Sequence, residues 1–325
     1  MTEPPPRTCT YQNRDKSFCE HPAGESELCF WHDPKQPKDQ PEVKEKLEAL
    51  VNAGHSIEGF RLSWADLQGA RLMGKGGLNA QDTDFSHANL QAGHLYHINL
   101  QGADLFKCNC TDANLNEAQF AGANLLRCKF FGAGLTHVKW GKNLVQHANF
   151  RRARQEKNWD EVNSNYQQLE EIFRHLKQVH EQSGEFMLAG EFFHREMIVR
   201  RKKMPLYSAQ RFLSKMVDLT SGYSERPLRV VVSSVFLTLF CALVYFGIGV
   251  EGPEGHIGYL PGQSMSKHLS DLGNCLYFSV VTFTTLGYGD ITPRGIAKAV
   301  AAFEAFGGAF GMALFVVTFA KRMSK

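Results

Sequence analysis

The stretch TTLGYGD, Thr284–Asp290, lies between two long apolar runs near the end of a chain of 325 residues. Glycine and aspartate are poor helix formers, so this stretch is expected to be extended. The run before it, residues 228–250, rises roughly 35 Å as a helix, which is enough to cross the hydrocarbon core of a bilayer. Pro227 suits the first position of that helix. The run after it, residues 296–320, is of similar length.

The 45 residues between the two runs divide into a polar part and an apolar part. Residues 251–271 are rich in turn formers and predict an external loop. Residues 272–285 are apolar but too short to cross, so they predict a re-entrant helix. Non-helical backbone at membrane depth is tolerated only when it is buried in protein or lines a watery path. The TLGYG backbone is therefore expected to line a path.

Potassium selection requires a column of backbone carbonyls that replaces the hydration shell of the ion. Successive carbonyls point the same way only if some residues adopt positive φ, which glycine does at low cost. Gly287 and Gly289 are spaced for this, and the Thr285 hydroxyl adds a further oxygen ligand. Because one chain supplies one strand, a closed ring of carbonyls needs several copies.

The motif matches the signature T-x-G-Y-G-D, and residues 225–325 resemble the two-transmembrane potassium channel family. The resemblance implies a homotetrameric α-helical pore that passes K+ through a selectivity filter. It places Tyr277 and Phe278 in supporting positions, although many relatives have tryptophan where this chain has Phe278, which puts filter rigidity and inactivation in doubt. Leu286 takes a position that is usually valine. The implied filter residues are Thr284, Thr285, Leu286, Gly287, Tyr288, Gly289 and Asp290.

The second apolar run contains an acid and three glycines that need an explanation. Glu304 is costly in lipid, so it is expected to face protein or water and to have a partner. A structural hydrogen bond behind the pore helix is favoured over a role in permeation. Gly307, Gly308 and Gly311 either let the helix bend during gating or allow close helix packing.

A bulky residue returns at every fifth position from Phe85 to Phe150, with a small residue usually two places earlier. This period fits neither a helix nor a strand, and it predicts stacked coils. Sequences such as ANLQA and ADLFK resemble the pentapeptide-repeat family, which implies a right-handed quadrilateral β-helix over residues 55–152. Seven acidic and eight basic residues between 55 and 150 argue against an anionic DNA mimic. A rigid spacer or docking scaffold is the simplest role.

Three further helical segments are expected. Residues 41–54 predict a short helix, and residues 153–205 carry two amphipathic patterns separated by EQSGE, which predict a helical hairpin. Residues 206–226 predict either an interfacial helix, with Arg211 and Lys215 toward headgroups, or a linker helix. The pore domain is expected over residues 227–325.

Residues 1–40 are polar and predict a metal-supported segment. Cys9, Cys19, Cys29 and His32 would complete a tetrahedral structural Zn²⁺ site, with His21 as a competing ligand. The alternative is a set of free cytosolic thiols. The other cysteines are expected to be core or membrane residues: Cys108, Cys110, Cys128, Cys241 and Cys275.

Charge and motifs set the remaining expectations. Basic residues flank both outer ends of the apolar runs, so both termini are expected in the cytoplasm of a cell membrane of the bacterial inner-membrane type. The formal charge of +3 gives no reason to expect nucleic acid. The chain shows no motif of an enzyme. Two functions remain: a potassium channel modulated or anchored by its cytosolic part, or a membrane-tethered scaffold or sensor with a vestigial pore. A protein or small-molecule regulator is left unidentified.

Overall fold

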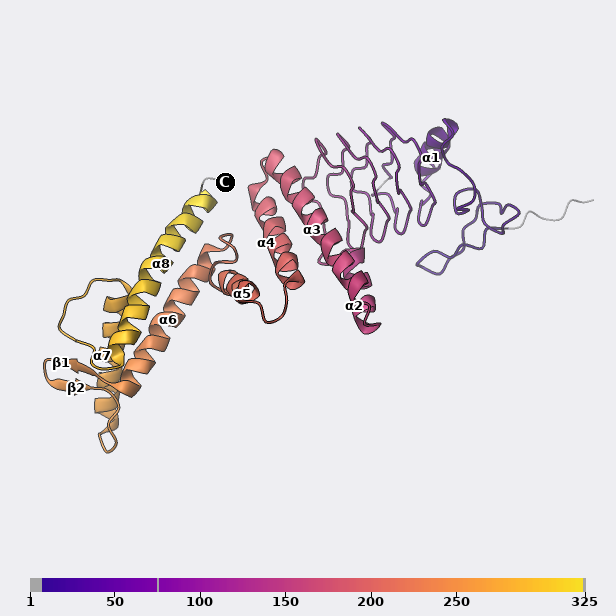
Figure 1. Ribbon diagram of the computed structural model, residues 1–325. Helices are drawn as coiled ribbons and strands as arrows, with labels where there is room; N and C mark the ends of the chain where they lie inside the picture. The colour runs from indigo at the N-terminus through magenta and orange to yellow at the C-terminus, as the bar shows by residue number, and fades with distance from the viewer. Residues whose placement is uncertain (1–7, 75, 324–325) are drawn as a thin grey trace, which may run out of the picture. The chain divides into compact units, whose positions relative to one another are not determined.

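The computed structural model describes residues 8–74 and 76–323, apart from the side chains at 321 and 322 (Figure 1). The chain divides into two compact units, residues 1–203 and 204–325. The first unit contains the five-residue repeats and a group of helices. The second unit contains both helices that are long and apolar enough to cross a membrane. Each unit is described by itself.

The first unit begins with an irregular segment followed by a short helix. Two isolated antiparallel bridges, Thr8–Pro22 and Gln12–Phe18, fold residues 8–22 back on themselves. Helix α1, Glu42–Asn52, lies inside the predicted range 41–54. It buries one apolar stripe, Val43, Leu47 and Val51, in the same core as the repeats.

The repeats form stacked coils joined by parallel backbone bridges (Figure 1). The bridges pair Asp84 with Asp104 and Asn89 with Asn109, so a coil takes twenty residues, or four repeats. Both the bulky and the small inward positions are sealed from solvent: Leu105 and Ala103, for example, are 0% exposed. Stacking therefore buries a continuous ladder of side chains. In the first coil the pairing distance is 23 residues up to Arg71 and His94, and it is twenty from Asn79 and Asn99 onward, so the three extra residues lie between Arg71 and Asn79.

The coils end earlier than the period-five pattern predicts. The last bridge of the stack pairs Gln119 with Lys139. Val145 keeps the period, but it begins helix α2, Val145–Gln155, and Phe150 lies on the same helix. The boundary at 152 is therefore corrected to about residue 140. Phe150 packs against Tyr166 of the following helix, with ring centroids 4.7 Å apart, instead of entering the interior of a further coil.

Helices α3 and α4 form the predicted hairpin. Helix α3, Trp159–Gln182, starts at Asn158, whose side chain accepts a hydrogen bond from the backbone N–H of Glu161. Helix α4 spans Phe186–Lys203, after a turn at Gly184 with φ of +77°. The hairpin covers the end of the repeat core, where the rings of His180 and Phe192 pack edge-on against Trp140.

The second unit starts with α5, Ala209–Ser221, whose apolar face is exposed: Phe212 and Leu213 are 68% and 65% accessible. Next come α6, Pro227–Ile248, and a short antiparallel pair, β1 (Val250–Gly252) and β2 (Gly255–Ile257). Helix α7 spans Met265–Phe283 and α8 spans Ala297–Met323. Helices α6, α7 and α8 pack against one another.

Helix α7 is longer than the predicted re-entrant segment. Its first two turns come from polar residues that were assigned to the external loop. Two local interactions explain why they are helical: the Ser264 side chain accepts from the Lys267 N–H, and the Lys267 ammonium lies 3.2 Å from the buried Asp271 carboxylate one turn later. The hydrophobic pattern alone did not reveal this start.

Candidate functional site

The TTLGYGD segment leaves the C-terminal end of α7 with three residues in left-handed conformation. Gly287 and Gly289 have φ of +58° and +79°, and Thr285 has φ of +57°. The glycine conformations were expected, whereas a threonine with positive φ carries no sequence signal. The leucine and tyrosine side chains, Leu286 and Tyr288, are 60% and 68% exposed in the single chain. A Cβ atom added at Gly287 or Gly289 would meet no atom within 4 Å. One chain therefore leaves this segment uncovered on one side.

The segment is anchored at both ends. At its start, the Thr284 hydroxyl donates to the Val280 carbonyl of α7 at 2.8 Å, and the Leu286 N–H donates to the Val281 carbonyl at 3.0 Å. After it, Thr292 pairs with Glu251 through two backbone hydrogen bonds of 2.7 and 2.9 Å. At the last residue of the motif, the Asp290 carboxylate interacts with the Tyr277 hydroxyl of α7. The helix and β1 thus fix where the exposed backbone begins and ends.

Glu304 of α8 is fully buried and joins three helices. Its carboxylate accepts a 2.7 Å hydrogen bond from the Tyr245 hydroxyl of α6 and a short one from Ser279 of α7. The Ser279 oxygen also lies 2.8 Å from the Thr238 carbonyl. This arrangement fits the structural hydrogen bond that was favoured for Glu304. The two hydroxyl partners were not identified from the sequence, although a buried acid between apolar segments requires such donors.

The glycines of α8 lie where the helices approach closely. A Cβ at Gly308 would collide with the Phe283 carbonyl at the end of α7, and one at Gly307 would lie 3.1 Å from Leu237. At Gly311 the nearest atom would be the Ser234 oxygen at 3.4 Å. Close helix packing therefore explains why these three positions are occupied by glycine. The helix is continuous through all three glycines, and bending remains a prediction.

Phe278 packs behind the motif instead of beside its tyrosine in the single chain. It is 6% exposed, and its ring meets the Tyr245 ring edge-on at 4.9 Å. Together with Glu304 and Ser279, this contact makes the side of α7 that faces α6 a packed layer. The preceding residue, Tyr277, is 40% exposed and interacts with Asp290 of the motif.

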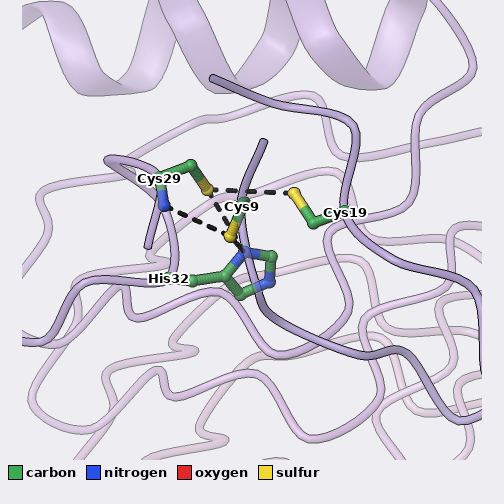
Figure 2. A group of neighbouring side chains, drawn as sticks. All are labelled: Cys9, Cys19, Cys29 and His32. Atoms are coloured by element: carbon green, nitrogen blue, oxygen red, sulfur yellow. Dashed lines mark hydrogen bonds between the residues drawn. The ribbon is translucent and has the colours of Figure 1, made fainter. Parts of the chain in front are cut away.

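Four potential metal ligands converge near the start of the first unit, as Figure 2 shows: Cys9, Cys19, Cys29 and His32. All four are buried, and their ligand atoms lie within 4.8 Å of one another. The Cys19 and Cys29 sulfurs are 3.9 Å apart, and His32 Nδ1 lies 3.6 Å from the Cys9 sulfur. A tetrahedral site with Zn–S of about 2.3 Å and Zn–N of about 2.0 Å would have S–S edges of about 3.8 Å and S–N edges of about 3.5 Å. The donor set therefore fits a metal ion.

The surroundings of the cluster select one imidazole nitrogen. His32 Nε2 lies 3.0 Å from the Glu58 carbonyl, to which it donates when protonated, and this leaves Nδ1 free to face the sulfurs. His21 does not join the cluster; its ring packs near His55 and Phe60. Burial raises the pKa of the Cys29 thiol to about 12 and lowers the pKa of His32. Without a cation the Cys29 thiol keeps its proton, so a bound ion must displace it.

Two parts of the chain match models of known protein families. Residues 231–325 match the family model described as "Ion channel", and residues 83–118 and 108–139 match pentapeptide repeats in 8 copies. No curated protein matches the chain significantly.

Solved structures of pentapeptide repeat proteins are similar to a part of the chain. One is Rfr23 from the cyanobacterium Cyanothece 51142, at 29% identity and a TM-score of 0.26, covering 27% of this chain. The chain spans 57% of the length of that protein. Another, from Nostoc PCC 7120, has 26% identity and a TM-score of 0.27, covering 34% of this chain and 92% of its own. The predicted resemblance is confirmed: within one chain, pentapeptide repeats precede an ion channel domain with two membrane-capable helices.

Proposed function

We propose that this protein is a potassium-selective channel in which four copies of residues 284–290 surround one ion path. The observation that carries the proposal is the TTLGYGD backbone itself, which follows α7 with Gly287 and Gly289 at positive φ and one side uncovered. Four such strands would supply rings of carbonyl oxygens that replace the water around K+. The carbonyls of Thr285, Leu286, Gly287 and Tyr288 are the proposed ligands.

The proposal includes a place in the membrane. Helices α6 and α8 cross a cell membrane of the bacterial inner-membrane type, and both termini lie in the cytoplasm. The basic residues at the start of α6, Arg226 just before it and Arg229 in its first turn, support this orientation. The repeats then form a right-handed, four-sided cytosolic β-helix that modulates gating or anchors the channel. The protein acts by passive permeation and not as an enzyme.

The test is ion flux through the full-length protein reconstituted in liposomes. We expect K+ efflux that barium blocks, and single-channel recordings under bi-ionic K+ and Na+ in which K+ strongly dominates. The mass of the detergent-solubilised protein should correspond to four copies. A monomer, equal permeation of the two ions, or no flux from correctly inserted protein would contradict the proposal. The last result would favour the membrane-tethered scaffold with a vestigial pore.

We also propose that the four-ligand cluster holds Zn²⁺. Three sulfurs and one imidazole nitrogen are the ligand set that zinc takes in structural sites, where all four positions are filled by protein. The buried positions of Cys9, Cys29 and His32 support a closed site without a water ligand. Elemental analysis of the purified protein should give one zinc per chain, and Cys19→Ser should lower this content. Full-length protein without bound metal after purification in zinc would refute the assignment.

A further inference from the structure

The first coil of the repeats has an open edge. In the interior of the stack, one coil donates backbone hydrogen bonds to the coil before it: Asp84 N–H to the Phe60 carbonyl and His94 N–H to the Ala70 carbonyl, both at 2.8 Å. The corresponding N–H groups of the first coil, at Arg61 and Arg71, have no earlier coil to meet. Such an edge is a template for unwanted pairing, so solenoids need a cap.

Two different parts of the N-terminal segment fill these positions. The Arg61 N–H donates to the Trp31 carbonyl at 2.7 Å. The Arg71 N–H donates to the Glu48 carboxylate at 2.8 Å. Glu48 is held by helix α1, which is regular structure with its own buried stripe. Trp31 instead lies between Cys29 and His32, inside the turn that supplies two of the four metal ligands.

The metal cluster is joined directly to the same coil. His32 Nε2 lies 3.0 Å from the carbonyl of Glu58, three residues before Arg61. The Trp31 ring is stacked on the Phe60 ring, with centroids 5.3 Å apart and planes within 8°. The turn at 29–32 therefore contacts the coil through a carbonyl, an imidazole and an indole. An interaction that fixes this turn also fixes the cap of the Arg61 edge.

Other contacts also hold residues 8–40: the Thr10 N–H donates to the Glu27 carbonyl at 3.0 Å, and the Ser26 hydroxyl donates to the Asp33 carboxylate at 2.7 Å. This segment is built from turns and two isolated bridges, and the bridges lie before residue 23. The cluster adds links between distant parts of this segment, because it brings Cys9 to Cys29 and Cys29 to Cys19. Short polar segments of this kind commonly take their folding free energy from the metal.

We propose that a zinc-class ion on Cys9, Cys19, Cys29 and His32 closes the open edge of the repeat solenoid by fixing the Trp31 carbonyl on the Arg61 N–H. This inference rests on the proposed metal site and is independent of the proposed ion selectivity. The proposed effect of the metal is local: it stabilises the cap at Arg61, whereas Arg71 is capped by Glu48 of α1 and does not need the ion.

Hydrogen exchange on the full-length protein tests this division. Mass spectrometry would compare zinc-loaded protein with protein treated with a chelator, with the bound metal measured in each sample. On metal removal we expect exchange at Arg61 to accelerate by at least about tenfold, because its capping partner opens locally. Exchange at Arg71 and at Asp104, inside the stack, should remain unchanged.

A matched variant reverses the pattern. Glu48→Ala removes the carboxylate that caps Arg71 and leaves all four metal ligands, so Arg71 should lose protection while Arg61 keeps it. If the protein binds no zinc, the metal site and this inference both fail. If zinc binds and Arg61 exchange is the same with and without it, only the inference fails. Equal loss of protection in every coil would also overturn it, because the metal would then hold the whole fold.

Discussion

The repeat coils and the TTLGYGD segment both stack backbone on backbone, but they find their neighbours differently. A coil meets the next coil of the same chain, and its inward residues, such as Leu105, are completely buried in a single copy. The TTLGYGD segment has no such neighbour within the described residues of its chain, and Tyr288 is 68% exposed. The first kind of stack is complete in one chain, whereas the proposed pore is complete only in an assembly.

This difference predicts which property of the protein a substitution should change. In the coils a change is felt by the chain that carries it, because the interior is packed locally. In the proposed filter a change is repeated in every copy around the ion path. Small changes there should alter selectivity strongly, and large changes in the coils should alter stability instead. Three substitutions and a change of pH, in order of decreasing expected effect, test this contrast.

The largest effect is expected from Gly289→Ala. Its φ of +79° costs an L-residue about 1–2 kcal/mol, and the strain is repeated in each copy. We expect the K+/Na+ permeability ratio to fall toward about one, as measured by reversal potentials under bi-ionic conditions. Gly273→Ala is the matched control, since a Cβ there also meets no atom within 4 Å but the position is helical. A Gly289→Ala variant that keeps the K+/Na+ permeability ratio of the wild type would contradict the proposed role of this backbone in selectivity.

Leu115→Ala should act on the coils alone. This side chain is 0% exposed, and truncating a buried leucine costs about 2–5 kcal/mol. We expect lower thermal stability of the repeat unit, followed by circular dichroism, with an unchanged permeability ratio. Lys142→Ala, at an exposed site, should change stability by less than about 0.5 kcal/mol. A shift in selectivity with Leu115→Ala would mean that the two stacks are coupled.

Glu304→Ala should weaken the contact of α8 with α6 and α7. It leaves the hydroxyls of Tyr245 and Ser279 without their shared acceptor, and a buried unpaired polar group costs about 1–3 kcal/mol. We expect a lower melting temperature of the solubilised assembly. Glu304→Gln keeps an acceptor oxygen and should recover much of the loss. If Glu304→Gln is as damaging as alanine, the charge itself matters and the structural role is incomplete.

The smallest effect is expected from pH at the helical end of the coils. Burial lowers the pKa of His180, against the opposing effect of the Glu185 carboxylate 2.6 Å from Nδ1. Because the unfolded chain takes up this proton first, stability should fall as pH drops below about 6.5. Above that pH the group contributes no difference. Thermal unfolding at pH 5.5 and 7.5 should show an acid loss in the wild type that exceeds the loss in His180→Asn by at most about 1 kcal/mol. An equal loss in the two proteins would assign the effect elsewhere.

Short-range patterns in the sequence predicted much of the fold. The period of five predicted the stacked coils because every repeat packs against equivalent neighbours. The motif gave Gly287 and Gly289 because only glycine takes positive φ cheaply. The end of the coils was predicted too late because Val145 and Phe150 keep the spacing of five although both lie on helix α2. The start of α7 was missed because its polar first turns depend on Ser264 and not on apolar periodicity.

The partners of buried polar groups were less predictable. Tyr245 and Ser279 lie 59 and 25 residues from Glu304, so only the packing of three helices brings them together. The four-ligand cluster was found in the sequence because cysteine and histidine are few in a polar segment, and the metal it would hold stays a proposal. Their link to Arg61 through Trp31 is a backbone contact, which leaves no trace in side-chain chemistry.

The three extra residues between Arg71 and Asn79 have a practical consequence. The pairing distance is 23 residues before them and twenty after them, yet Arg71 still pairs with His94 and Asn79 with Asn99. A segment that already takes extra residues while the pairs on both sides are kept offers a point for an inserted peptide tag or fluorophore. A label inserted there would report on the repeat unit while leaving the stacked coils intact.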